Sequence, residues 1–503
     1  MQRFQTPHQA AQWLQERVTG HLRTDNRNVQ VNDGFIAWPG AAHDARRFVN
    51  SALEQGASAC LVEESGAEAF AWNDVPHVDD RVASYSGLKS ACGPLAASFY
   101  QNPSEKIDVI AITGTNGKTT CAWWLAHALQ NLGKPSSIVG TLGLGRPDSL
   151  TPTGMTTPDP VLLQSHLREM VDVGVTSCVM EASSIGLAEH RLDGTHIQLA
   201  MFTNFSQDHL DYHGDMDRYW QAKEALFDWP KLPIAVINID DPKGALLASK
   251  LQKEGQVKVW TYAIQKQNNQ TVSQHIQARH VEYANRGMQF EIQIGDSVAS
   301  LQTSTVGDYN VSNLTGVMVC LCALGHRLDD VVKVCQELPS VPGRMELLGA
   351  AGEPLVVVDF AHTPDAIEKA LLAIQPLAAI RGGDIICVLG CGGNRDKAKR
   401  PLMAAVAERH AQHIVLTSDN PRKEDPEAIL HDMCAGLKAP QSARIVMDRA
   451  QAIAEAVQHA QHNDLVLIAG KGHETYQEIN DVKYPFSDQL LAQLAIRNRS
   501  VHV

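Results

Sequence analysis

A glycine-rich turn between an apolar run and a helical pattern offers the first recognisable chemistry in this chain. Gly114-Thr115-Asn116-Gly117-Lys118-Thr119-Thr120 follows the apolar run 109–112 and opens a helix predicted over 119–132. Backbone N–H groups of such a turn cradle phosphate, Lys118 neutralises the β- and γ-phosphate oxygens, and the Thr119 hydroxyl can ligate Mg²⁺. Ile112 stands where the strict GxxxxGK[ST] pattern has its first glycine, so the prediction depends on the strand–turn–helix context.

Further ligand types follow this turn in the chain. Glu181 ends the apolar run 177–180, which suits a carboxylate that holds Mg²⁺ opposite the phosphate turn, although any strand end can carry a carboxylate. His209 belongs to the cluster 203–213, where a solvated loop explains a single histidine equally well. Lys223 falls in the apolar stripe of a helix predicted over 215–228. It either snorkels to solvent or lies near metal or phosphate, where CO₂ can convert it to a carbamate.

Charged clusters also follow the apolar runs of the C-terminal third. Residues 390–395 differ from a dinucleotide fingerprint because Arg395 takes its last glycine position, so Arg395, Lys399 and Arg400 are read as cations past a strand. In Asp419-Asn420-Pro421-Arg422, Pro421 fixes a turn and Arg422 can clamp a carboxylate, with a plain surface turn as the alternative. Residues 470–474 supply both signs of charge, which an amino acid substrate needs.

The apolar runs that precede these clusters predict an α/β protein of three domains, as a length of 503 residues also suggests. Residues 1–91 are predicted to form a small α/β domain, which includes a helix over 44–53. Residues 92–342 are predicted to form a P-loop-type doubly wound ATPase domain, and 343–503 a Rossmann-like α/β domain. Residues 339–343 are the predicted linker, and 140–160 a long surface loop.

Composition excludes several classes of protein. Lys and Arg number 43 against 56 Asp and Glu, a net charge of −13, which argues against a surface that coats nucleic acid. No run approaches the ~20 apolar residues of a membrane span, and the first ten residues lack a signal-peptide core. The ten cysteines are scattered without zinc-site spacing and are expected to be reduced thiols, so a cytoplasmic protein is expected.

Taken together, these segments resemble the Mur ligase family, the ATP-dependent amino-acid ligases of peptidoglycan synthesis, over nearly the whole chain. The resemblance is closest to members that add a diamino acid to UDP-N-acetylmuramoyl-L-alanyl-D-glutamate. It rests on residues 114–120, 156–160, 181–184, 208–211 with Lys223, 309–310, 343–346, 359–365, 393–401 and the two C-terminal clusters. It implies that ATP phosphorylates the D-glutamyl carboxylate, that the incoming amine attacks the acyl phosphate, and that the product serves cell-wall growth and division.

The resemblance also implies a role for each matching residue. Lys118, Glu181, His209 and Lys223 form the catalytic set; Thr119 holds one Mg²⁺, while Glu181, His209 and Lys223, as N6-carboxylysine, serve a second. ATP contacts fall on Gly114, Thr115, Asn116, Gly117, Lys118, Thr119, Thr120, Asn310 and Arg344. Contacts to the nucleotide-sugar dipeptide fall on Asn26, His43, Thr156, Thr157, Ser183 and Arg191. Contacts to meso-diaminopimelate fall on Arg395, Asp419, Asn420, Pro421, Arg422, Gly470 and Glu474.

Arg422 indicates meso-diaminopimelate, because this substrate carries a distal carboxylate that L-lysine lacks, and the lysine-adding members generally have another residue there. Some positions depart from the family pattern: Asn26 replaces a serine, Ile185 a histidine, Glu189 a glutamine and Phe360 a tyrosine. Glu189 would place a carboxylate near an anionic ligand unless Arg191 pairs with it.

Three alternatives stay open: an L-lysine-adding ligase, a folylpolyglutamate synthase, and a nucleotide-gated module that forms no bond. The expected partners are small molecules only, with ATP as a substrate and Mg²⁺ as the cofactor, and the expected state is a monomer without nucleic acid.

Overall fold

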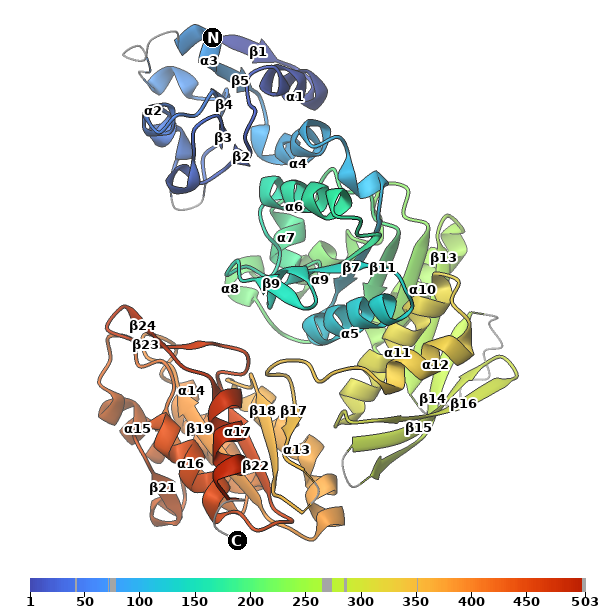
Figure 1. The fold of residues 1–503 in the computed structure, drawn as a ribbon, viewed down its shortest axis with the longest axis vertical. Coiled ribbons are helices and arrows are strands. Elements are labelled where there is room, and N and C mark those ends of the chain that lie inside the picture. The colour runs from blue at the N-terminus through green and yellow to red at the C-terminus, as the bar shows by residue number, and fades with distance from the viewer. Residues whose placement is uncertain are drawn as a thin grey trace. The chain divides into compact units, whose positions relative to one another are not determined.

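The computed structural model describes residues 1–40, 43–70, 72, 78–264, 274–284, 287–350 and 352–499. The chain divides into two compact units, one formed by Met1–Ile276 with Gly316–Val334 and the other by Gln277–Thr315 with Cys335–Val503. Both units combine helices with largely parallel sheets (Figure 1), so the prediction of an α/β protein is confirmed.

The first unit begins with a sheet of five parallel strands in the order β1-β5-β4-β3-β2. Apolar side chains of its strands and of two helices form one core, which includes Leu14, Ile36, Leu61 and Leu95. A limit after residue 91 would divide α4, so we propose that the N-terminal domain extends beyond Phe99. The elements are β1 (Gln2–Phe4), α1 (Pro7–Gln15), β2 (Leu22–Arg23), β3 (Gly34–Ala37), α2 (Val49–Glu54), β4 (Ala59–Glu63), α3 (Val78–Arg81), β5 (Val82–Tyr85) and α4 (Leu88–Phe99).

A second sheet of the first unit runs in the order β13-β12-β11-β6-β10-β7-β8-β9, and its strands from β13 to β7 are parallel. The predicted apolar runs 109–112 and 177–180 lie in β6 and β10, and β11 and β12 are equally apolar, because strands buried on both faces are continuous apolar segments. The strands are β6 (Asp108–Thr113), β7 (Ser136–Gly140), β8 (Gly143–Arg146), β9 (Ser149–Thr151), β10 (Ser177–Glu181), β11 (Leu199–Phe202), β12 (Ile234–Asn238) and β13 (Lys258–Ile264).

Helices alternate with these strands, as a doubly wound sheet requires. They are α5 (Lys118–Asn131), α6 (Pro160–Asp172), α7 (Ser184–Ala188), α8 (Leu210–His213), α9 (Met216–Glu224) and α10 (Pro242–Glu254). Two further helices, α11 (Asp308–Ala323) and α12 (Leu328–Gln336), follow later in the chain.

The predicted surface loop over 140–160 is wrong for part of its length, since β7, β8 and β9 form an antiparallel meander there. Gly145 has a φ of 139°, and a Cβ at this position would lie 2.3 Å from the Ser149 carbonyl oxygen. The glycines that suggested a loop therefore permit the close backbone approach of a tight hairpin.

The second unit contains a six-stranded sheet in the order β17-β18-β22-β19-β20-β21, parallel except for β17. Helices α13, α14 and α15 share a core with one face, whereas α16 and α17 share a core with the other. The strands are β17 (Glu346–Leu348), β18 (Leu355–Asp359), β19 (Ile385–Cys391), β20 (His413–Ser418), β21 (Ala443–Ile445) and β22 (Leu465–Ala469). The helices are α13 (Pro364–Arg381), α14 (Lys399–His410), α15 (Pro426–Cys434), α16 (Arg449–His459) and α17 (Asp488–Arg499).

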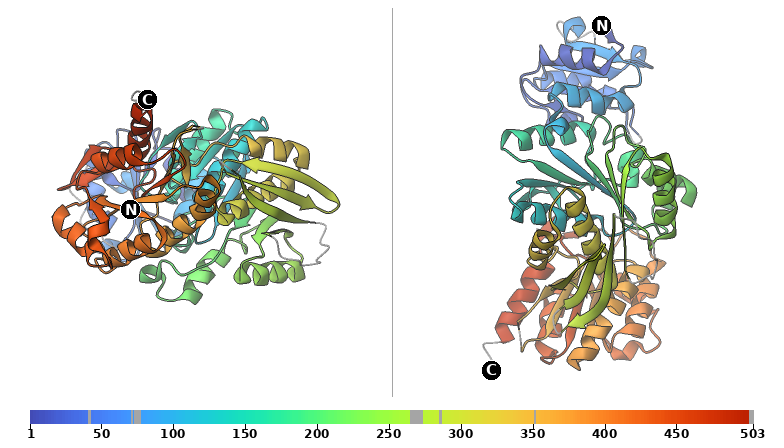
Figure 2. Two further views of the ribbon diagram at one scale, coloured as in Figure 1. Left: turned by 90° about the horizontal axis from the view of Figure 1, so that it is seen from below. Right: turned by 90° about the vertical axis from the view of Figure 1, so that its right-hand side faces the viewer.

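Two antiparallel features accompany this sheet in the second unit. Strands β15 (Gly287–Ile294) and β16 (Ser297–Thr303) follow β14 (His275–Ala284) and form the long twisted ribbon visible in Figure 2. A separate hairpin, β23 (Tyr476–Ile479) with β24 (Val482–Pro485), follows β22 in the chain. The clusters predicted to bind an amino acid come directly after β19, β20 and β22, at the carboxyl ends of parallel strands.

Candidate active site

The phosphate-binding turn joins β6 to α5, as its sequence context predicts. Gly114 has a φ of 144°, and a Cβ there would lie 1.9 Å from the Thr203 hydroxyl oxygen, so glycine is required. The Asn116 N–H donates to the Asn204 side-chain oxygen over 2.9 Å, which fixes the turn from the end of β11. Lys118 Nζ donates to the carbonyls of Gly114 and Thr115, both over 2.9 Å, so its ammonium lies over the turn.

A buried carboxylate lies beside the first residues of α5. Glu181, at the end of β10, is 2% exposed, and its Oε2 accepts a hydrogen bond of 3.0 Å from the Thr119 hydroxyl. Its Oε1 accepts a hydrogen bond of 2.8 Å from the Thr141 N–H. Hydroxyl and carboxylate oxygens are the ligands that Mg²⁺ prefers, so Thr119 and Glu181 fit the predicted metal. The described residues contain no group of three His, Cys, Asp or Glu side chains that could hold a metal.

Lys223 lies in the interior, on α9, with an exposed fraction of 1%. The snorkelling alternative is therefore excluded. Its Nζ donates to the Gly114 carbonyl over 2.7 Å and lies 4.4 Å from the centre of the Tyr219 ring. Burial, assisted by the charge of Lys118, lowers the pKa of Lys223 to about 6. Most of this side chain is consequently a neutral amine at pH 7, which is the form that reacts with CO₂.

The histidines of the 203–213 cluster lie in different environments. His209 is exposed, precedes α8 with a φ of 50°, and has its Nε2 3.5 Å from an Asp208 carboxylate oxygen. His213, which the sequence did not single out, is buried, and its Nε2 lies 3.0 Å from the Ser184 hydroxyl. Burial lowers the pKa of His213, so a neutral ring shares a hydrogen bond at the start of α7.

Four of the six residues predicted to hold the nucleotide-sugar dipeptide come together around Glu181. The Thr157 hydroxyl donates to the Glu181 carbonyl over 2.7 Å and lies 3.0 Å from the Ser183 hydroxyl. Arg191 Nη1 donates to the Thr157 carbonyl over 2.8 Å. The Thr156 hydroxyl lies 3.0 Å from the Thr141 hydroxyl, so Thr141, which no sequence motif singled out, links this group to the metal-type ligands.

The carboxylate of Glu189 is compensated, although chiefly by a residue other than the expected Arg191. Lys89 Nζ lies 2.6 Å from Glu189 Oε2, and the Tyr212 hydroxyl donates to the same carboxylate. These contacts, with Lys89 contributing most, lower the pKa of Glu189.

The two residues predicted to contact the uridine nucleotide lie in loops of the N-terminal sheet. Asn26 begins a short 3-10 helix (Asn26–Asn28) after β2, and the Asp25 side chain caps this helix. His43 follows β3 and is exposed, and its carbonyl accepts a hydrogen bond of 2.9 Å from the Gly40 N–H.

Asn310 and Arg344, the two remaining residues predicted to contact ATP, belong to the second unit. Asn310 is 4% exposed and donates to the Val306 carbonyl over 2.9 Å. The Arg344 guanidinium lies 4.7 Å from the centre of the Phe360 ring, and its Nε is buried without a hydrogen-bond partner among the described residues. Phe360 therefore supplies an aromatic face although it lacks the hydroxyl of the common tyrosine.

The predicted diamino-acid residues form a connected network at the ends of β20 and β22. Asn420 is 2% exposed, and its Nδ2 donates to Glu474 Oε2 over 2.8 Å. The fully buried Lys471 donates to Asn420 Oδ1 over 3.0 Å and to Glu474 Oε2 over 2.8 Å. Arg422 donates from Nη1 to the Gly393 carbonyl over 2.9 Å. The network thus brings together the Glu474 carboxylate, which pairs with Lys471, and the Arg422 guanidinium.

The other residues read as ligand contacts in this region differ in their exposure and in their partners. Gly470 has a φ of 122°, and a Cβ at this position would lie 2.6 Å from Asp419 Oδ2. The cluster 470–474 and the cluster 419–422 are therefore in contact. Arg395 is exposed after β19. Arg400, in contrast, is fully buried and pairs with Glu424 and Asp432, both at 2.9 Å. Reading Arg400 as a cation for a ligand was wrong, because its charge is neutralised within the fold.

A phosphate turn with a buried carboxylate in one unit, and a network of both charges in the other, define a nucleotide-dependent ligase that accepts an amino acid. The Mur ligase middle domain model matches residues 112–321, and the model of the Mur ligase, glutamate ligase domain matches 343–472. The chain belongs to the Mur ligase family.

Individual relatives are similar over the full length. The UDP-N-acetylmuramoyl-L-alanyl-D-glutamate–2,6-diaminopimelate ligase of Acidovorax sp. (strain JS42) is 51% identical over 501 residues, covering 98% of each chain. The ligase of the same name from Janthinobacterium sp. (strain Marseille) is 44% identical, covering 97% of this chain and 96% of the relative. A solved structure of a ligase with that name has a TM-score of 0.69 and 33% identity over 95% of both chains. In the described part of this chain, no helix has the length and apolarity to span a membrane.

Proposed function

We propose that this protein uses ATP to join meso-diaminopimelate to UDP-N-acetylmuramoyl-L-alanyl-D-glutamate by an amide bond, in peptidoglycan synthesis. The observation that carries the proposal is the network in which Asn420 connects Glu474 to the turn that bears Arg422. The distal end of meso-diaminopimelate has one ammonium and one carboxylate, and this network offers one partner for each. The names of the relatives support the same substrates.

The first step is transfer of the γ-phosphoryl group of ATP to the free carboxylate of the D-glutamyl residue. Backbone N–H groups at the end of the turn and at the α5 N-terminus bind the phosphates, and Lys118 turns from the turn carbonyls to the γ-phosphate. Thr119 and Glu181 would hold Mg²⁺, which would neutralise phosphate charge. Thr156, Thr157, Ser183 and Arg191 orient the dipeptide carboxylate beside them.

Lys223 contributes to this step as a carbamate. Its neutral amine would form a bond to the carbon of CO₂ and lose a proton to solvent, so that a carbamate anion replaces a buried neutral amine. With Glu181 and His209, this anion would offer ligands for a second Mg²⁺. The low pKa of Lys223 and its position 2.7 Å from the Gly114 carbonyl support this assignment.

The second step is attack of the diamino acid on the acyl phosphate. Arg422 and Glu474 hold the distal carboxylate and ammonium, which leaves the other amine to attack the carbonyl carbon. The tetrahedral intermediate then expels phosphate. An L-lysine substrate would leave the Arg422 charge without its partner, and this favours meso-diaminopimelate over the lysine-adding alternative.

A phosphate-release assay tests the proposal directly. Purified enzyme with ATP, magnesium and the UDP-linked dipeptide is given meso-diaminopimelate, L-lysine or no amino acid. We expect rapid phosphate release and an amide product with meso-diaminopimelate, and much slower release in the other two arms. Equal turnover with L-lysine would select the lysine-adding alternative. Product formation without consumption of nucleotide, or nucleotide binding without any product, would contradict the proposal.

We further propose that the enzyme works as a cytoplasmic monomer. No disulfide joins any of the ten cysteines, all of which lie among the described residues, as expected where thiols remain reduced. Sedimentation of the purified protein checks the monomer, and a stable dimer would contradict it.

A further inference from the structure

We infer that Glu478, on the β23–β24 hairpin, is a positioning residue that holds Arg422 ready for the distal carboxylate of the diamino acid. Glu478 matches none of the motifs that identify the family in this sequence. The inference rests on the proposed function, since it concerns how that substrate is selected.

The backbone of the Arg422 turn is joined to the hairpin. Arg422 has a φ of 53°, a left-handed conformation that residues with a Cβ adopt at a cost. Two hydrogen bonds offset this cost: the Arg422 N–H donates to the Glu478 carbonyl over 3.0 Å, and the Asn480 N–H donates to the Arg422 carbonyl over 2.8 Å. The position of Arg422 is therefore determined by a strand that lies far from it in the sequence.

The side chains form a second connection. Arg422 Nε lies 3.2 Å from Glu478 Oε2, and the two side chains are 20% and 22% exposed. Arg422 Nη1 donates to the Gly393 carbonyl, so the guanidinium is held from two sides. Because a guanidinium has several N–H donors, these two contacts leave donors at its Nη end for a substrate carboxylate. Glu478 thus holds the Nε edge of the guanidinium, and the substrate carboxylate binds at its Nη end.

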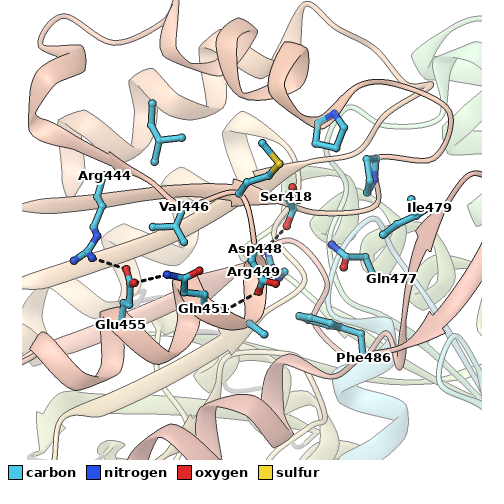
Figure 3. Close-up of a pocket in the computed structure, with 15 residues that line it drawn as sticks. Ser418, Arg444, Val446, Asp448, Arg449, Gln451, Glu455, Gln477, Ile479 and Phe486 are labelled. Atoms are coloured by element: carbon cyan, nitrogen blue, oxygen red, sulfur yellow. Dashed lines mark hydrogen bonds and ion pairs between the residues drawn. The ribbon is translucent and has the colours of Figure 1, made fainter.

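Glu478 is also connected, through Asn420, to Glu474. The Glu478 N–H donates to Asn420 Oδ1 over 2.9 Å, and Asn420 in turn donates to Glu474. The neighbouring side chains Gln477 and Ile479 line a cavity of about 860 Å³ on the other face of the strand (Figure 3), as the alternation of a strand requires. Glu478 is therefore the side chain of this strand end that is directed at Arg422.

Three substitutions separate positioning from charge. Glu478→Gln keeps the length and an acceptor oxygen but loses the charge, Glu478→Asp keeps the charge but withdraws it by one methylene, and Glu478→Ala loses both. A charge-assisted hydrogen bond to the substrate strengthens its binding about tenfold. We therefore expect Glu478→Ala and Glu478→Asp, which release Arg422 from its position, to raise the KM for meso-diaminopimelate about tenfold. We expect Gln to stay within about threefold of the parent enzyme, with kcat and the KM for ATP unchanged in all three variants.

A double-mutant cycle and a matched control complete the test. In an Arg422→Ala background, Glu478→Ala should have no further effect on the KM for meso-diaminopimelate. Glu455→Ala removes a carboxylate of similar exposure that pairs with Arg444 in the same unit (Figure 3), and it should leave all kinetic constants unchanged.

Three results would overturn the inference: a parent-like KM in Glu478→Ala, a Gln variant as impaired as Asp, or an equal rise of the KM for ATP. The Gln and Asp variants decide the question alone if Glu478→Ala does not fold. A parent enzyme that fails to use meso-diaminopimelate at all would instead refute the proposed function.

Discussion

At the scale of single residues, the proposed choice of meso-diaminopimelate depends on one guanidinium, that of Arg422. Arg422→Ala should lower kcat/KM for meso-diaminopimelate by at least about tenfold, because one charge-assisted contact of roughly 1.5–3 kcal/mol is lost. Steady-state kinetics with varied amino acid measures this effect. Arg444→Ala is the control. Arg444 lies in β21 of the six-stranded sheet, is half exposed, and pairs with Glu455 at 2.6 Å. Unchanged kinetics in Arg422→Ala would refute the assignment.

Lys223, as a carbamate, is proposed to act in the first chemical step. Lys223→Ala should fold but lose acyl-phosphate formation, which ADP release in the absence of the diamino acid reports. Lys250→Ala is the control, because Lys250 is more exposed and pairs with Glu224 and Asp228. A bare ammonium at Lys223 in a high-resolution crystal structure with bound magnesium would contradict the carbamate.

The pKa of Lys223 also predicts a pH dependence. Its folded value of about 6 lies below the ordinary 10.5, so the reactive neutral amine dominates above pH ~6 and disappears below it. The carbamate signal in ¹³C NMR with labelled bicarbonate should therefore fall as the pH decreases through about 6. A signal that persists well below that pH would show that the amine is not the titrating group.

At the scale of elements, a buried ion pair ties together the strand ends that carry the amino-acid network. Arg449 donates to Asp488 over 2.8 and 2.7 Å, and both side chains are fully buried. Arg449 also donates to the carbonyls of Ser418 and Ala469, the last residues of β20 and β22. Asp419 and Gly470 come directly after these residues, so the pair fixes the register at which the two clusters meet.

Arg449→Leu should lower the free energy of unfolding by about 3–5 kcal/mol, because it leaves the Asp488 carboxylate buried without its partner. Urea denaturation measures the change. The double variant Arg449→Leu/Asp488→Leu should recover much of the loss, since it leaves no unpaired charge, and Arg444→Ala should cost less than about 1 kcal/mol. An Arg449→Leu protein as stable as the parent would contradict this account.

The elements differ in how well the sequence predicts them. Each predicted apolar run of the two doubly wound sheets is a strand, because buried parallel strands need uninterrupted apolar residues. The helix predicted over 44–53 is a 3-10 turn (Ala45–Phe48) followed by α2, and Gly56 after it has a positive φ of 103°. The β8–β9 hairpin escaped prediction, because its glycines serve a close backbone approach that composition does not reveal.

The same distinction holds within the candidate site. The phosphate turn follows from local spacing and was predicted from it, whereas spacing placed Lys223 in an apolar stripe and left its burial open. Thr141 and Glu478 were not predicted, because each acts through a partner that only the fold brings near, Glu181 for one and Arg422 for the other. Local patterns identify groups that do chemistry themselves, whereas residues that position them become visible through tertiary contacts.

At the scale of the whole molecule, one reaction draws on both compact units. Lys118, Glu181 and Lys223 belong to the first unit, while Arg422 and Glu474 belong to the second. The chain passes between the units at 276/277, at 315/316 and, within α12, at 334/335, and this last crossing comes shortly before the predicted linker 339–343. An acyl phosphate formed by one unit must therefore meet an amine held by the other, and this requirement predicts a change in their arrangement during turnover.

Small-angle X-ray scattering tests this change. We expect the profile of the protein with a non-hydrolysable ATP analogue, the UDP-linked dipeptide and meso-diaminopimelate to differ from that of the free protein. The amino acid alone should produce little change, because it occupies residues of the second unit only. Arg422→Ala should need a higher concentration of meso-diaminopimelate for the full effect, since the amino acid is one of the ligands that stabilise the ligand-bound arrangement. Identical profiles with and without all ligands would mean that capture of the acyl phosphate requires no rearrangement, and that the linker has no role in turnover.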